Sequence, residues 1–107
     1  MKFEEIMDGI KGIEFDTVRV KDQYYFEAVI LRDKLPVLTE RLEKLFGKQI
    51  CPPGKKLAPD VEKVVGAFGG VMGDQTLYFL KEKNYCYFAM LWPWSDDYHI
   101  TVKLGRK

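Results

Sequence analysis

Residues 85–92 constrain the fold of this chain more than any other segment. They read Tyr-Cys-Tyr-Phe-Ala-Met-Leu-Trp, so that large apolar or aromatic side chains occupy both alternating sets of positions. Successive side chains of a strand point to opposite faces of its sheet. A strand that is apolar on both faces is typical of a central position with a cover on each side. We therefore expect this strand inside a sheet, with helices against one face and a second cover over the other.

Four other segments have the residue patterns of strands. The clearest is 98–104, where apolar and polar residues alternate strictly, as in a strand with one buried face. Residues 24–31 are rich in the aromatic and β-branched types that favour strands. Residues 21–23 can form the turn that joins residues 17–20 to this strand in a hairpin. The four predicted strands are residues 17–20, 24–31, 76–80 and 98–104.

Three segments have the spacing of helices. In residues 3–12, apolar side chains recur at intervals of three and four positions, which indicates one buried helical face. The strongest helix is expected from Asp33, as its N-cap, to Phe46, and Gly47 suits its end. Pro59 is well placed to start a third, short helix, because proline is favoured in the first helical turn.

These elements predict one α+β domain over residues 1–107, with the order α-β-β-α-α-β-β-β. An antiparallel sheet of about five strands, with the helices packed on one face, satisfies every pattern. Its element order is similar to that of PAS-like, profilin-like and roadblock-like domains. The chain shares no residue signature with those families, so the similarity concerns the order of elements only.

Charge and composition exclude several classes of function. The formal net charge is +1, whereas nucleic-acid binding draws its affinity mainly from an excess of basic residues. Neither an apolar run of membrane-spanning length nor the apolar core of a signal peptide occurs in the sequence. Cys51 and Cys86 are too few for a secreted disulfide scaffold. We expect a cytoplasmic protein that binds neither nucleic acid nor a membrane.

Three groups of residues have the appearance of functional motifs, and a structural explanation is preferred for each. The glycines of residues 66–73 follow a helix, whereas a phosphate-binding loop precedes one. Residues 95–99 contain Ser, Asp and His, but Ser-Asp-Asp is ordinary turn chemistry and His99 is expected on a polar strand face. Cys51, Cys86 and His99 lack the close spacing of a zinc site. We therefore predict no catalytic residue, metal or cofactor.

The aromatic side chains of the last two strands are the feature that points to function. Residues 85–92 require shelter on both faces, and a large exposed apolar patch usually marks a binding site. Trp92 is expected to continue the core, and Trp94, beyond the strand end, to lie half-exposed. The candidate binding residues are Trp92, Trp94, Tyr85, Tyr87 and Tyr98.

Three hypotheses of function follow, in order of preference. The first is a non-catalytic binding or assembly domain, joined as a homodimer or to a protein partner through the aromatic sheet face or an edge strand. The second is a sensor that binds a small molecule in a pocket between the helices and the sheet. The third is a small hydrolase that uses His99, for which the residues give the weakest support.

Overall fold

The computed structural model describes residues 2–47, 59–66 and 75–107, and it has the predicted order of helices and strands. A single turn of 3-10 helix, η1, joins β2 to α2. The fold is therefore the α+β arrangement that the residue patterns indicate. The elements are α1 (Phe3–Gly9), β1 (Thr17–Lys21), β2 (Tyr25–Leu31), η1 (Arg32–Lys34), α2 (Leu35–Phe46), α3 (Pro59–Gly66), β3 (Thr76–Lys81), β4 (Cys86–Pro93) and β5 (His99–Arg106).

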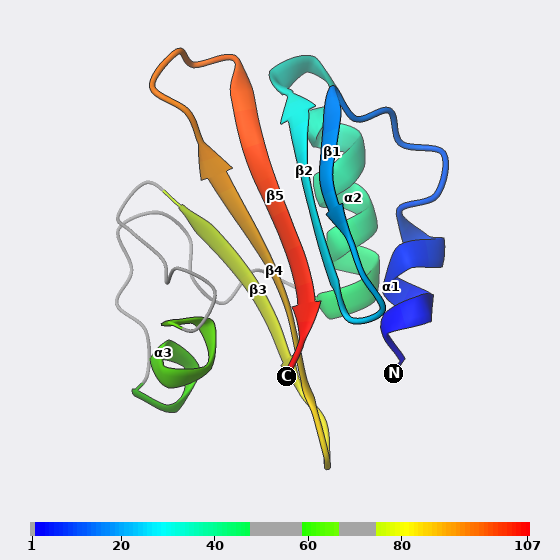
Figure 1. The fold of residues 1–107 in the computed structure, drawn as a ribbon, viewed down its shortest axis with the longest axis vertical. Helices are drawn as coiled ribbons and strands as arrows, with labels where there is room; N and C mark the ends of the chain where they lie inside the picture. The colour runs from blue at the N-terminus through cyan, green and yellow to red at the C-terminus, as the bar shows by residue number, and fades with distance from the viewer. Residues whose placement is uncertain (1, 48–58, 67–74) are drawn as a thin grey trace.

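The five strands form one antiparallel sheet in the order β1-β2-β5-β4-β3 (Figure 1). β4 lies between β5 and β3, which confirms the interior position expected for the strand that is apolar on both faces. The β1–β2 turn, the β3–β4 turn and both chain ends lie at one end of the sheet. The β4–β5 turn lies at the other end, as Figure 1 shows.

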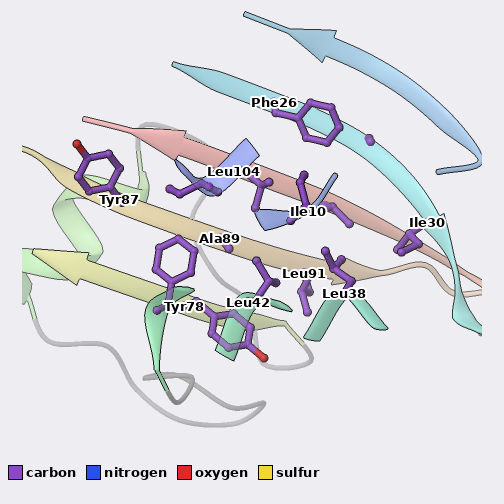
Figure 2. Close-up of a cluster of buried hydrophobic side chains, with 14 of the residues drawn as sticks. Ile10, Phe26, Ile30, Leu38, Leu42, Tyr78, Tyr87, Ala89, Leu91 and Leu104 are labelled. Carbon is purple, nitrogen blue, oxygen red and sulfur yellow. The ribbon is translucent and has the colours of Figure 1, made fainter. Parts of the chain in front are cut away.

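One face of the sheet packs against α1 and α2. Ile6 and Ile10 come from the α1 region, Leu38 and Leu42 come from α2, and all four are buried in one cluster. The sheet contributes alternate residues of its four long strands, among them Phe26, Ile30, Tyr78, Tyr87, Ala89, Leu91 and Leu104 (Figure 2). This is the main core, because it holds most of the fully buried apolar side chains of the described chain.

The opposite face carries a smaller apolar cluster of Leu77, Phe88 and Met90. Val61 of α3 packs against it, as do Tyr25 and Trp92. The expected placement of the helices on one face therefore holds for α1 and α2, whereas α3 contributes to the other face. From Tyr87 to Leu91, the β4 side chains on both faces are buried within a single chain, because burial of apolar surface on each face is favourable.

Two predicted helix boundaries differ from the structure. Asp33 is not an N-cap: it lies inside η1, Lys34 precedes α2, and no side chain caps the helix. Proline in the first turn of α2 lacks an N–H, so fewer donors need a cap there. α1 ends at Gly9 instead of residue 12, whereas Gly47 does end α2, in a positive-φ conformation that favours glycine.

Candidate functional site

The structure separates the five predicted binding residues into two groups at opposite ends of β4. Trp92, Trp94 and Tyr98 lie at the end where β4 turns into β5. Tyr85 and Tyr87 lie at the end where β3 turns into β4. The two groups therefore belong to separate surfaces. The predicted strand over residues 85–92 already implied this division, because Tyr85 and Tyr87 stand at its start and Trp92 and Trp94 at its end.

Trp94 is held in one orientation although 37% of its surface is exposed. Its indole N–H donates a hydrogen bond of 2.8 Å to the hydroxyl of Thr101, which is buried on the neighbouring strand. Its ring stacks on His99 with 4.6 Å between centroids and 26° between planes. Tyr98 meets the other side of this group, with its ring edge-on to His99 at 5.2 Å. The result is a fixed aromatic group with one side open to solvent.

The turn beneath Trp94 is organised by Asp96. One carboxylate oxygen accepts hydrogen bonds from the backbone N–H of Tyr98 at 2.9 Å and of His99 at 3.0 Å. The other lies 2.5 Å from His99 Nδ1. The backbone bond from His99, the backbone bond from Tyr98 and the His99 side chain together lower the pKa of Asp96 to about 2, so it remains ionised at neutral pH. The carboxylate therefore orders the turn, as Asx chemistry predicts.

Residues 95–99 do not form a hydrolytic triad in the part of the chain that the structure describes. Asp96 and His99 contact each other within one turn, and Ser95 makes no hydrogen bond to His99. The next residue, Asp97, has a φ of 61° and forms an ion pair with Arg32. Each acidic side chain therefore has a structural role in the turn.

Charged residues surround the two tryptophans on the same face of the sheet. The ammonium of Lys103 lies 3.3 Å from the centre of the Trp92 ring, and the guanidinium of Arg19 lies 5.6 Å from that of Trp94. Both are within the range of cation–π attraction. Glu27 lies 3.7 Å from Arg19 and accepts a hydrogen bond of 2.6 Å from the hydroxyl of Tyr25. We call this set of residues the Trp94 face: Arg19, Tyr25, Glu27, Trp92, Trp94, His99, Thr101 and Lys103.

Burial affects the titration of two groups on this face. It lowers the pKa of Lys103, and Arg19 lowers it further, while Glu27 acts in the opposite direction. Burial also raises the pKa of Tyr25 well above its usual range, and the hydrogen bond to Glu27 adds to this effect. Tyr25 therefore stays a neutral phenol that donates to Glu27.

Sequence reasoning missed the charged members of the Trp94 face. A signal for one of them was present, since the alternation in β5 places Lys103 on the same side as His99 and Thr101. Glu27 stands opposite Lys103 in the β2–β5 register. Arg19 could not have been placed, because β1 contains an irregularity between Val18 and Val20 that changes which face its residues occupy.

We expect substitution by phenylalanine to destabilise the fold by different amounts at the two tryptophans. Trp94→Phe leaves the buried Thr101 hydroxyl without its donor, so we expect unfolding free energy to fall by about 1–2 kcal/mol. Trp92 Nε1 is buried and has no hydrogen-bond partner in the described chain, so Trp92→Phe removes a donor that was never satisfied. We expect a smaller loss than for Trp94→Phe, because no hydrogen bond is given up and only the packing of the larger ring is reduced. Urea unfolding of the two variants measures the difference, and equal losses would contradict the assignment.

The second group surrounds Arg106 at the other end of the sheet. The Arg106 guanidinium lies 3.5 Å from the centre of the Tyr24 ring and 3.9 Å from that of Tyr85. Tyr87 stands opposite Arg106 in the β4–β5 register and is buried. These residues line a pocket of about 560 Å³. The remaining lining residues are Lys2, Phe3, Glu4, Gln23, Glu82, Lys83 and Asn84.

The described residues contain no cluster of three or more His, Cys, Asp or Glu side chains that could hold a metal ion. Cys86 is a free thiol, partly buried in β4. Cys51 and residues 67–73 of the predicted glycine loop lie outside the described residues. No helix within the described ranges is both long and apolar enough to cross a membrane.

Comparison of the chain with protein-family models, with curated proteins and with solved structures finds no match in any of the three.

Proposed function

We propose that this chain is a non-catalytic assembly domain that pairs with a second copy of itself through the Trp94 face. The observation that carries the proposal is the state of Trp94, which is exposed but immobilised by Thr101 and His99. Binding hot spots are enriched in tryptophan and arginine, and a side chain already held in one rotamer loses little entropy when a partner covers it.

The charges around Trp94 support a second copy as the partner. Arg19 and Lys103 are cations, Glu27 is an anion, and all three lie within one face. In a two-fold symmetric interface the same patch occurs on both partners, so a patch that contains both signs can match a rotated copy of itself. A partner whose surface carries charge of one sign would be repelled by the residues of the same sign on this face.

The edge strands support the proposal less well than the sheet face. β1 is short, irregular between Val18 and Val20, and carries Arg19 and Lys21, which are features that discourage strand addition. β3 is also short, and it ends in the charged residue Lys81. The face around Trp94 is therefore the preferred interface.

The oligomeric state of the purified chain tests this proposal directly. We expect sedimentation velocity between about 1 and 500 µM to show a reversible monomer–dimer equilibrium. Trp94→Ala should weaken the dimer by about tenfold or more, as expected for a hot-spot residue. Arg19→Ala should weaken it too, with no loss of an internal hydrogen bond to Thr101.

Tyr85→Ala is the matched control, because Tyr85 is also an exposed aromatic residue but lies at the other end of β4. It should leave the dimerisation constant unchanged. A single-chain mass at every concentration would refute self-assembly, and equal weakening by the Trp94 and Tyr85 variants would refute the interface. Circular dichroism of each variant confirms that the sheet is retained.

The pocket beside Arg106 favours the second candidate function, the binding of a small molecule. It lies between the start of α1 and the sheet, the kind of position where small-ligand sites occur. We expect either activity to operate in the cytoplasm.

A further inference from the structure

We propose that the pocket at the Arg106 end of the sheet binds a small organic carboxylate with an apolar or aromatic body. This site is separate from the Trp94 face and does not depend on the assembly proposed above. It is formed by segments that are far apart in the sequence, from the start of α1, the β1–β2 turn, the β3–β4 turn and the end of β5.

The Arg106 guanidinium is fixed between two tyrosine rings. Its central carbon lies within 4 Å of both ring centres, at 3.5 Å from Tyr24 and 3.9 Å from Tyr85. Two rings that lie so close to one carbon atom approach the guanidinium from different sides. The backbone also holds Arg106, since its N–H donates to the Tyr24 carbonyl at 3.0 Å. The N–H donors along the edge of the guanidinium are left as its available contacts.

Those edge donors have no carboxylate partner within residues 2–47, 59–66 and 75–107. Arg19 and Arg32 each form an ion pair, whereas Arg106 forms none with any residue that the structure describes. A planar guanidinium presents paired donors that match a carboxylate in a two-point contact. An arginine that is fixed by aromatic rings and has no acidic partner is preorganised for an external anion.

The charges that line the pocket favour a monoanion. Lys2, Lys83 and Arg106 are cationic, and Glu4 and Glu82 are anionic, which leaves one net positive charge. A carboxylate neutralises that charge, whereas a phosphate dianion would exceed it and meet two glutamates. This balance therefore selects a carboxylate over phosphate among the anions that an arginine can bind.

The apolar part of the lining indicates the body of the ligand. Phe3 and Tyr87 are the buried aromatic residues of the lining, and Tyr24 and Tyr85 are the exposed ones. Burial raises the pKa of Tyr87 while Arg106 acts in the opposite direction, so the phenol stays neutral beside the cation. A pocket of about 560 Å³ has room for a small aromatic acid.

Benzoate is a suitable probe, and the Arg106 Nε–Hε signal in 1H–15N NMR is the readout. We expect a saturable shift of this signal with benzoate and a dissociation constant below about 10 mM. Benzamide has nearly the same shape without the charge, and inorganic phosphate has charge without the ring. Both should bind at least about tenfold more weakly, because each lacks one of the two features that the pocket matches.

Arg106→Lys keeps the positive charge but loses the planar donor pair, so it should weaken benzoate binding by about tenfold or more. Arg32→Lys makes the same change at an arginine outside the pocket lining and should leave benzoate binding unchanged. Tyr85→Leu is a second test that retains the arginine, and it should also weaken binding. Backbone amide signals, followed in each variant, show whether the fold is retained.

Three results would overturn the proposal. No saturable shift up to about 50 mM benzoate would show that the pocket is not a site for this class of ligand. Equal affinity for benzoate and benzamide would exclude carboxylate recognition, and tighter binding of phosphate would exclude the preference for a monoanion. Dimerisation, read by sedimentation, is a separate measurement and can fail or succeed independently.

Discussion

Leu42→Ala should lower the free energy of unfolding by about 2–5 kcal/mol, the range for truncating a fully buried leucine. Leu42 lies on the inner face of α2 and has no exposed surface, among the side chains that join this helix to the sheet (Figure 2). The loss combines the transfer of the removed methyl groups with the cavity left behind. Urea unfolding, followed by circular dichroism, gives the free energy directly.

Val37→Ala is the control in the same helix. Val37 is 46% exposed, so its removal leaves no cavity, and alanine is the better helix former. We expect a change within about 0.5 kcal/mol in either direction. If Leu42→Ala were equally mild, α2 would not be packed on the sheet in the way that the core cluster indicates.

Gly105→Ala should lower the free energy of unfolding by about 1–3 kcal/mol through overpacking. Gly105 of β5 stands between Tyr25 of β2 and Phe88 of β4 in the sheet register. A Cβ atom there would lie 2.4 Å from the tip of the Phe88 ring. Phe88 has no exposed surface and packs between Leu77 and Met90, so it cannot move aside without disturbing that cluster.

A double mutant identifies the cause of this loss. Leucine in place of Phe88 shortens the side chain, so Gly105→Ala should cost less in the Phe88→Leu background than in the original chain. In the Gly66→Ala variant, no atom of the described residues lies within 4 Å of the new Cβ, so this variant should not be destabilised. Additive losses for Gly105→Ala and Phe88→Leu would contradict a direct clash between the two positions.

The Leu42 and Phe88 variants test the packing on the two faces of the sheet that carries both proposed sites. Trp92 and Trp94 lie at the end of β4 that turns into β5, and the Arg106 pocket lies at the opposite end. A variant at one site therefore serves as a control for the other.

The sequence by itself determined the elements and the interior position of β4. These features follow from local patterns: the alternation of apolar and polar residues, the positions of glycine and proline, and the apolar character of residues 85–92. Each pattern determines the secondary structure of its own segment. The prediction that Asp33 is the N-cap of α2 is wrong, because the chain forms η1 before the helix and Pro36 stands in the first helical turn. The packing of Val61 against the second face was also not predicted, since periodicity shows that a helix has an apolar face but not what covers it.

Only the tertiary structure decided which side chains meet. Arg106 reaches Tyr24 and Tyr85 because the order β1-β2-β5-β4-β3 brings the β1–β2 turn, the β3–β4 turn and the end of β5 together. Arg19 reaches Trp94 for the same reason. Strand order depends on contacts between residues that are distant in sequence. The free energies of these contacts depend on the packing of the whole domain, so the pattern of a short segment does not predict them.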